Sequence, residues 1–227
     1  YYRDQVVKKN DRILVLGYCV KPGFIGPTLV QLMPDGSLDA GFGDAGKASL
    51  QHGRDMKALA TQADNKIVLA GQHNTNSTDI DVLRLKPGGQ IDSSFGLDGV
   101  LAERRLGSLV VKEVLVQADT KIVICATSGS LHTTILLRYN SNGSPDLSFA
   151  NQGIATGATY MIGNAAALQS DGKILIGGYG YTANPQNSDP KFYIGRYSGN
   201  GTPDSSFGVN GQVTTDFEDE EEIINTV

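Results

Sequence analysis

The chain has 227 residues, 40% hydrophobic and 19% charged, a composition typical of a globular protein. Its formal net charge of −5 matches the five acidic residues of the run at 218–222, which we interpret as a solvated connector. The rest of the chain is balanced, and such a protein lacks the basic surface of a nucleic-acid binder. No apolar run approaches the roughly 18 residues that a membrane-spanning helix needs. We therefore predict neither a nucleic-acid partner nor a membrane span.

A nine-residue pattern recurs four times along the chain. The copies are LDAGFGDAG (38–46), IDSSFGLDG (91–99), PDLSFANQG (145–153) and PDSSFGVNG (203–211). Their phenylalanines, which are 53, 54 and 58 residues apart, are Phe42, Phe95, Phe149 and Phe207. A fixed period of this size is typical of a repeat protein.

Each repeat contains four short β-strand patterns separated by turn residues. The first strands are predicted at QVVK (5–8), KALATQ (57–62), EVLVQ (113–117) and AAALQ (165–169). The second strands are predicted at RILVLG (12–17), KIVLAG (66–71), KIVICA (121–126) and KILIGG (173–178). The continuous aliphatic runs of the second strands indicate burial on both faces.

The third strand of each repeat leads into the Asp-x-x-Phe pattern, and a short last strand follows it. The third strands are predicted at LVQLM (29–33), VLRLK (82–86), LLRYN (136–140) and IGRYS (194–198). The last strands are predicted at KASL (47–50), VLAE (100–103), IATG (154–157) and QVTT (212–215). Four antiparallel strands per repeat without helices predict an all-β fold, a β-propeller of four blades of about 54 residues.

The predicted domain organisation is one propeller array over residues 1–227. The blades are expected at about 1–50, 51–103, 104–157 and 158–215, with 216–227 beginning a further strand. In each Asp-x-x-Phe pattern we expect the aspartate to cap a single helical turn and the phenylalanine to be buried between blades. The aspartates are Asp39, Asp92, Asp146 and Asp204. The third strands carry a recurring arginine at Arg84, Arg138 and Arg196. We expect it to form a structural ion pair, with the aspartate of the same repeat as partner, or to donate to loop carbonyls.

LDAGFGDAG, SDGKILIGG and LLRYNSNGS together resemble the delta-60 repeat, a bacterial propeller repeat similar in style to NHL repeats. The resemblance covers essentially the whole chain. Gln31 departs from it, because it stands where the other copies have arginine, and so does Ala150, which replaces a glycine. Proteins with this repeat are typically secreted or surface-associated and have no assigned activity. The resemblance therefore implies a secreted or cell-surface location.

Candidate binding residues lie in the segments that vary between repeats. In an up-and-down blade the turn after the first strand and the turn after the third strand share one rim. The connections from the second to the third strand and the crossings between blades therefore share the other rim. These connections are expected at 18–28, 72–81, 127–135 and 179–193. Loops held by a rigid scaffold are where binding residues concentrate. The predicted binding residues are His73, Arg105, His132, Tyr179 and Tyr181.

The sequence predicts no metal and no cofactor. The histidines lack the spacing of a compact metal site, and no nucleophile, phosphate-binding or dinucleotide motif is present. We predict no disulfide between Cys19 and Cys125, which occupy non-equivalent places in their repeats.

Three functions remain open from the sequence. The first is a non-catalytic module that binds a protein or carbohydrate through the variable rim. The second is a propeller hydrolase or lyase with a site at the channel mouth, and the third is a purely structural assembly repeat. Four blades are the minimum for a closed ring, so we also predict completion by neighbouring repeats or by a second copy. In that prediction 222–227 joins the opening blade, with Arg3, Lys8 and Lys9 near the acidic run.

Overall fold

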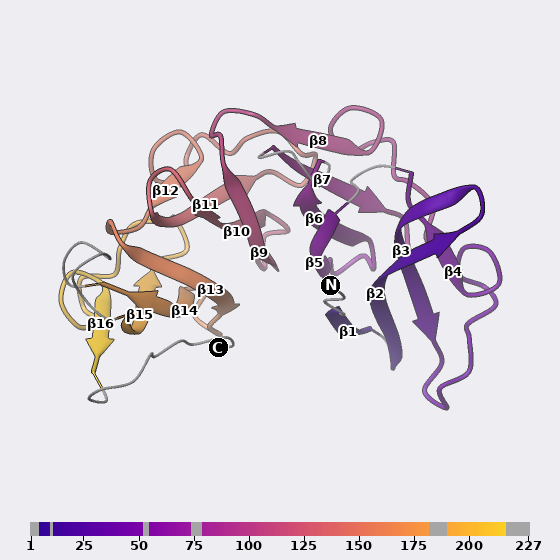
Figure 1. Cartoon of the computed structure of the whole chain (residues 1–227), viewed down its shortest axis with the longest axis horizontal. Helices are drawn as coiled ribbons and strands as arrows, with labels where there is room; N and C mark the ends of the chain where they lie inside the picture. Colours follow the sequence, from indigo (N-terminus) through magenta and orange to yellow (C-terminus); the bar gives the residue numbers. More distant parts are fainter. Residues whose placement is uncertain (1–4, 10, 52–54, 74–78, 182–189, 217–227) are drawn as a thin grey trace. The chain divides into compact units, whose positions relative to one another are not determined.

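The computed structural model describes residues 5–9, 11–51, 55–73, 79–181 and 190–216. Within these ranges the chain is all β and has no helix, and its strands form four antiparallel sheets of four strands each (Figure 1). This confirms the predicted fold class, with one sheet for each repeat, here called blades 1 to 4. Contacts divide the chain into two compact units, residues 1–107 with 141–144 and residues 108–140 with 145–227.

The first unit holds blades 1 and 2, whose strands lie in chain order across each sheet. Blade 1 consists of β1 (Gln5–Lys9), β2 (Arg12–Lys21), β3 (Phe24–Leu32) and β4 (Lys47–Ser49). Blade 2 consists of β5 (Asp55–Thr61), β6 (Ile67–Gln72), β7 (Ile80–Leu85) and β8 (Val100–Glu103). Every residue of β6 is buried, as its continuous apolar run predicts. Every residue of β7 is buried as well, although this strand contains Asp81 and Arg84.

The second unit holds blades 3 and 4, with the same strand order. Blade 3 consists of β9 (Leu109–Val116), β10 (Ile122–Ser128), β11 (Thr133–Tyr139) and β12 (Ile154–Thr156). Blade 4 consists of β13 (Met161–Leu168), β14 (Ile174–Gly180), β15 (Lys191–Tyr197) and β16 (Gln212–Thr215).

The prediction of a loop at 18–28 is wrong. β2 and β3 continue through it as a long hairpin, with Tyr18 opposite Pro27 and Lys21 opposite Phe24 in the register. The tight turn is possible because Gly23 has a φ of 80°, which glycine adopts without steric cost. The hairpin exposes apolar side chains near its tip, since Val20 is 66% and Ile25 is 63% exposed.

The first strands of blades 3 and 4 begin four residues earlier than predicted. In blades 2, 3 and 4 the pairing of the first strand with the second contains a β-bulge, at Met56/Ala58, Cys125/Ala126 and Gly163/Ala165. The bulge adds one residue and interrupts the alternation of side chains between the two faces. A prediction from the alternation of apolar and polar residues therefore begins the strand at the bulge and misses the residues before it.

The aspartate of the Asp-x-x-Phe pattern stabilises a turn rather than a helix, which corrects the predicted helical turn. In blade 3, Asp146 Oδ1 accepts hydrogen bonds from the Ser148 amide at 3.1 Å and from its hydroxyl at 2.7 Å. The Phe149 amide donates to the carbonyl of Asp146 at 3.1 Å, which closes the turn. A side chain that bonds the amide two residues ahead is an Asx turn, so capping by the aspartate occurs without a helix.

The phenylalanine of each of the first three repeats fits against the glycine of the following turn. A β-carbon on Gly89 would lie 3.0 Å from the Phe42 ring, and one on Gly143 would lie 3.0 Å from the Phe95 ring. Phe42, Phe95 and Phe149 are at most 1% exposed, as predicted. The prediction that Phe207 is equally buried is wrong: it is only partly buried, because no following turn covers it among the described residues.

Candidate functional site

The strand order fixes which connections share an edge of each blade. Because consecutive strands are antiparallel neighbours, the turns between the first and second and between the third and fourth strands lie at one edge, here called the turn rim. The other connections and the crossings to the next blade lie at the opposite edge, here called the loop rim. All five predicted binding residues lie at the loop rim. The part of their loops at 74–78 and 182–189 lies outside the described residues.

In the second unit, three of the five predicted residues gather around Tyr160. The Tyr160 amide donates to the carbonyl of His132 at 2.7 Å, and the Tyr160 carbonyl accepts from the Tyr181 amide at 3.1 Å. The ring centroids of His132 and Tyr160 are 6.1 Å apart, and those of Tyr179 and Tyr181 are 5.8 Å apart in an edge-to-face arrangement. We call these four residues the aromatic cluster.

The aromatic cluster is only partly covered by the rest of the unit. His132 is exposed, and the three tyrosines are partly exposed. Partial burial, with the neighbouring Tyr181 as a smaller cause, raises the pKa of Tyr179, so its hydroxyl stays protonated and able to donate at neutral pH. The cluster therefore presents ring faces and hydroxyl groups together.

Comparison of repeats shows that the fold does not require aromatic residues here. Ser108 in blade 3 corresponds to Tyr160, because each directly precedes the first strand and has a positive φ of 61° and 66° respectively. Gly129 corresponds to Tyr181, since its amide donates to the Ser108 carbonyl at 3.0 Å. The same backbone contact is thus built from serine and glycine in blade 3 and from two tyrosines in blade 4. Tyr160 could have been found in the sequence by aligning these crossings.

The two other predicted residues lie in the first unit, in a cluster of charged groups on blade 2. Nδ1 of His73 lies 2.8 Å from Oδ2 of Asp81, and Nη2 of Arg104 lies 2.9 Å from Oδ1 of the same carboxylate. Arg105 binds Glu103 through Nε at 3.0 Å and Nη2 at 2.5 Å. Sequence reasoning missed the two carboxylates and Arg104, which have no repeat-wide pattern. We call these five residues the charged cluster.

The buried carboxylate fixes the orientation of His73. Asp81 is 3% exposed, whereas the His73 side chain is 51% exposed. An ionised carboxylate can only accept hydrogen bonds, so Nδ1 of His73 carries the proton in this contact. In the neutral ring, Nε2 then keeps its lone pair, which can accept a hydrogen bond.

At the position of Asp81, the described residues of blades 3 and 4 carry no charged side chain. Asp81 is paired with Gly71, a small residue of the second strand. The equivalent pairs are Ile135 with Ala126 in blade 3 and Tyr193 with Gly178 in blade 4. Two blades thus fill this buried place with an apolar or aromatic side chain. A buried carboxylate is more costly there, so the fold alone does not account for it.

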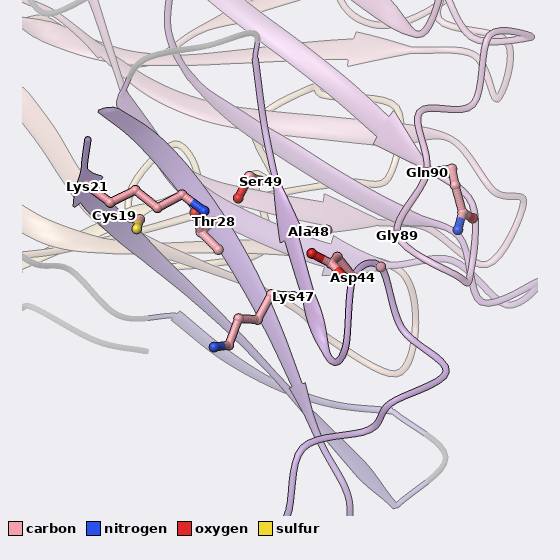
Figure 2. Close-up of a pocket in the computed structure, with 10 residues that line it drawn as sticks. Cys19, Lys21, Thr28, Asp44, Lys47, Ala48, Ser49, Gly89 and Gln90 are labelled. Atoms are coloured by element: carbon pink, nitrogen blue, oxygen red, sulfur yellow. The ribbon is translucent and has the colours of Figure 1, made fainter. Parts of the chain in front are cut away.

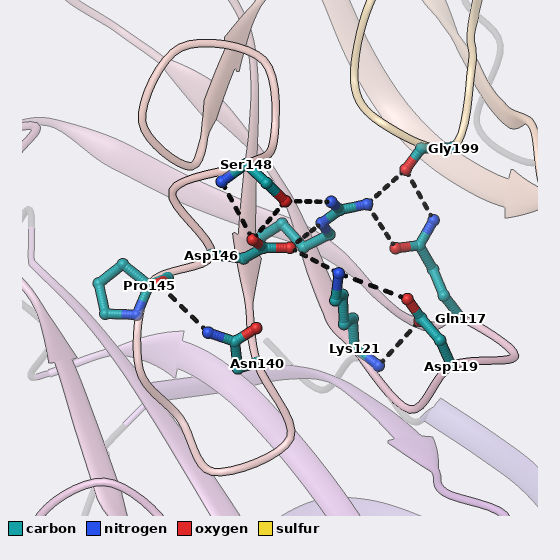
Figure 3. Close-up of polar contacts among 9 residues, drawn as sticks. Gln117, Asp119, Lys121, Asn140, Pro145, Asp146, Ser148 and Gly199 are labelled. Carbon is teal, nitrogen blue, oxygen red and sulfur yellow. Dashed lines mark hydrogen bonds and ion pairs between the residues drawn. The ribbon is translucent and has the colours of Figure 1, made fainter.

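The network around the recurring arginine is, by contrast, a structural feature of the repeat. In blade 3, Nε of Arg138 lies 2.8 Å from Oδ2 of Asp146, and Lys121 Nζ lies 3.1 Å from the same oxygen (Figure 3). Arg138 Nη1 also donates to Gln117 Oε1 at 3.1 Å and to the Gly199 carbonyl at 2.5 Å. The same arginine–aspartate distance of 2.8 Å recurs in blades 2 and 4, which confirms the predicted ion pair.

A pocket of about 570 Å³ lies beside blade 1, within the first unit (Figure 2). Lys21 and Lys47 contribute ammonium groups to its lining, and the buried Thr28 hydroxyl has no hydrogen-bond partner among the residues that the structure describes. The Asp44 carboxylate belongs to the same lining and opposes an anionic ligand. The pocket therefore combines charges of both signs and favours no single class of ligand.

The described part of the chain contains no group of three or more His, Cys, Asp or Glu residues that could hold a metal ion. Nor does it include any helix able to cross a bilayer. Cys19 and Cys125 are both free thiols. Burial raises the pKa of Cys125 to about 12, so this thiol is not a nucleophile near neutral pH.

Four sheets of four antiparallel strands, each followed through its third strand by a recurring Asp-x-x-Phe turn, define a β-propeller repeat protein. The chain belongs to the β-propeller family described as a domain of unknown function, DUF5122. The model of this family matches more than half of the chain, at residues 9–42, 62–95, 117–149 and 169–207.

One solved structure shares the fold at low sequence identity, and a second is more distantly similar. A protein of unknown function from Bacteroides caccae is 12% identical, with a TM-score of 0.53 over 99% of this chain and 71% of that one. An exo-β-1,3-galactanase from Clostridium thermocellum is 10% identical, with a TM-score of 0.49 over 87% of this chain. The chain spans 46% of the length of that galactanase structure. Among curated proteins, nothing matches the chain.

Proposed function

We propose that the chain is a non-catalytic binding module that takes a carbohydrate at the aromatic cluster of blade 4. The observation that carries the proposal is the pair Tyr160 and Tyr181, which stand where blade 3 has Ser108 and Gly129. Since the repeat folds with the smaller residues, the two rings are available for another purpose. Tyrosine supplies an apolar face and a polar hydroxyl, and a sugar ring offers a C–H face edged by hydroxyl groups.

The arrangement also limits the entropy lost on binding. Backbone hydrogen bonds of 2.7 and 3.1 Å join the cluster into one unit, and the ring of Tyr179 packs edge-to-face against that of Tyr181. Rings held in place before binding lose little conformational freedom, which favours affinity. A secreted or cell-surface location, implied by the delta-60 resemblance, would bring such a module into contact with external glycans.

The test compares binding of soluble neutral polysaccharides by isothermal titration calorimetry. Tyr160→Ser and Tyr181→Gly install the residues of blade 3, whose backbone conformation is already compatible with them. Ser170→Ala, in an exposed turn on the opposite rim of the same blade, is the matched control. We expect each tyrosine variant to bind at least about tenfold more weakly, a loss of about 1.4 kcal/mol, with an unchanged melting temperature. Unchanged affinity in both variants would contradict the proposal, and binding of a protein instead would favour the protein-ligand alternative.

The second candidate function is a hydrolase or lyase that uses His73 as a general base. It is favoured by the contact of 2.8 Å between His73 and the buried Asp81, because a carboxylate that orients a histidine is a recurring catalytic device. The test follows the release of reducing or unsaturated ends from the same polysaccharides, with His73→Gln as the control. The binding-module proposal expects no product from the natural chain, whereas turnover that is lost in His73→Gln would replace it.

A further inference from the structure

The crossing from β12 to β13 is held by two threonine side chains of β11. Thr133 Oγ1 donates to the Ala158 carbonyl at 2.7 Å. Thr134 Oγ1 donates to the Met161 carbonyl at 3.0 Å and accepts from the Gly163 amide at 2.7 Å. The two threonines are 2% and 1% exposed, so a ligand at the surface does not contact them. Their hydroxyls therefore act on the main chain of the crossing and of the start of β13.

Tyr160 lies between these contacts, and its backbone conformation needs support. Its φ of 66° is in the left-handed region, which a bulky side chain rarely adopts. Such a conformation persists where the surrounding structure determines it, and it occurs preferentially at functional sites. The backbone bonds of Tyr160 to His132 and Tyr181 join it to two other loops. The threonine hydroxyls, by contrast, fix the crossing to a buried strand of blade 3.

The crossing from blade 2 to blade 3 is held in the opposite way. By the register of the last two strands, Ile80 corresponds to Thr134 and Arg104 corresponds to Ala158. Arg104 Nη1 donates to the Ile80 carbonyl at 2.8 Å, so there the crossing supplies the side chain and the strand supplies the backbone group. In the crossing to blade 4 the strand supplies the hydroxyls instead. The side chains of this crossing are therefore left for contact with a ligand.

A glycine of β13 permits the close approach of the Thr134 hydroxyl. A β-carbon on Gly163 would lie 3.0 Å from Thr134 Oγ1 and 2.5 Å from the Ile176 side chain. Blade 3 has Val111 at this place, because Gly163 and Val111 pair with equivalent residues of their second strands. The first strand of a blade thus does not require glycine here, and the glycine belongs with the threonine to this crossing.

We propose that Thr134, together with Thr133, is a positioning residue for carbohydrate binding at the aromatic cluster. The inference rests on the proposed function and adds to it two residues that do not touch the ligand. They hold the Tyr160 backbone, so that its ring keeps its place beside His132, with 6.1 Å between the ring centroids. A ring that is fixed before binding loses little conformational freedom when the ligand arrives.

The test removes a hydroxyl without changing the shape of the side chain. Thr134→Val leaves the Met161 carbonyl and the Gly163 amide without their bonds to this side chain, whereas Thr134→Ser keeps the hydroxyl. Thr133→Val removes the single bond to Ala158, and it replaces Thr134→Val if that variant does not fold.

Thr127→Val is the matched control. Thr127 faces Thr134 in the register and is 8% exposed, and its hydroxyl makes no hydrogen bond among the described residues. Isothermal titration calorimetry measures the binding of three soluble neutral polysaccharides, glucomannan, arabinan and dextran. We expect Thr134→Val to bind about fivefold more weakly than the natural chain, and Thr134→Ser and Thr127→Val to stay within about twofold of it.

A double-mutant cycle separates positioning from a general loss of stability. Because Thr134 acts through Tyr160, Thr134→Val should change the affinity by less than about twofold in a Tyr160→Ser background. Equal losses in both backgrounds would overturn the proposal. So would an unchanged affinity of Thr134→Val, while Tyr160→Ser still weakens binding and the function of the aromatic cluster stands.

Hydrogen exchange tests the same role without a ligand. The Tyr160 amide, which donates to the His132 carbonyl, should exchange about tenfold faster in Thr134→Val than in the natural chain or in Thr127→Val. Unchanged exchange would show that the hydroxyl does not hold the crossing and would overturn the proposal. A natural chain that binds none of the three polysaccharides would overturn the proposed function and, with it, the role in binding, even where the exchange result holds.

Discussion

Nε of Arg12 lies 2.7 Å from Oδ2 of Asp39. In blade 1 the arginine that binds this aspartate therefore comes from the second strand, whereas in the other blades it comes from the third. Arg12 occupies the place that lysine holds in the other repeats, and Gln31 occupies the arginine place and donates to Asp39 at 2.6 Å. Among the described residues, blade 1 therefore has only the second-strand charge beside its aspartate, whereas the other blades have a second-strand lysine in addition to the third-strand arginine. Blade 1 keeps its ion pair, although the Arg12 side chain is 43% exposed against 6% for Arg138.

This difference in exposure predicts unequal losses of stability. Asp146→Asn leaves Arg138 buried beside an uncharged partner, and we expect a cost of about 3–5 kcal/mol, as for other broken buried ion pairs. Asp39→Asn removes the partner of a half-exposed arginine and should cost much less. Urea unfolding of the two variants measures the difference, and equal losses would contradict the assignment of a buried pair in blade 3.

The phenylalanines provide a second comparison. Phe95 is fully buried against Gly143, so Phe95→Ala should lower the free energy of unfolding by about 3–5 kcal/mol. Phe207 is only partly buried, and Phe207→Ala should cost less than half as much under conditions where the chain is monomeric. Guanidinium unfolding at low protein concentration gives both values. A Phe207→Ala cost as large as that of Phe95→Ala would show that Phe207 is covered in the monomer.

The repeat made most of the fold predictable, because each strand occurs in four copies and the features shared by all four indicate its position. β8 and β16 match their predicted bounds for this reason. The extension of the β2–β3 hairpin was missed because, among the described residues, the other blades do not show it. The bulges were missed because they break the period. Phe207 was assumed to behave like the other three phenylalanines, but its burial depends on the next turn along the chain rather than on its own repeat.

The candidate site was predictable in its position but not in its contacts. The strand order alone places His132, Tyr179 and Tyr181 on the loop rim, which is why they were singled out. Their link through Tyr160 depends on a backbone contact between two loops, and no local pattern indicates it. No local pattern indicates a role for Asp81 either, because in the sequence it is one residue of a mostly apolar strand.

The aspartates of the repeat predict how stability depends on pH. Desolvation acts to raise the pKa of Asp92, but hydrogen bonds from Ser94 and the charge of Arg84 outweigh it and lower the pKa to about 2. The pKa of Asp146 is lowered in the same way, by Ser148, Lys121 and Arg138 against desolvation. A carboxyl whose pKa is lower in the folded state stabilises the fold above its unfolded pKa, which is 3.8 for Asp92.

This stabilisation is lost as the pH falls through the folded pKa, because both states are then protonated. We expect the melting temperature to be nearly constant above about pH 5 and to fall steeply between about pH 4 and pH 2. Thermal unfolding followed by circular dichroism at several pH values measures this dependence. Asp92→Asn removes one titrating group and should make the dependence shallower. A melting temperature that is independent of pH in this range would contradict the lowered pKa values.

The charged cluster of blade 2 gives the last prediction, which separates a functional role from a structural one. His73→Ser, Asp81→Ile and Arg104→Ala together install the residues that blade 3 has at these places, Ser128, Ile135 and Ala158. Replacing a buried charge network with apolar residues is often neutral or stabilising by about 1–4 kcal/mol, so the triple variant should be at least as stable as the natural chain. Arg104→Ala alone should instead destabilise, because it leaves the buried Asp81 without its arginine partner. Urea unfolding of the two variants decides the question. A triple variant that loses several kcal/mol would show that blade 2 needs the cluster to fold, whereas a stable one leaves function as the reason for a buried carboxylate at this place.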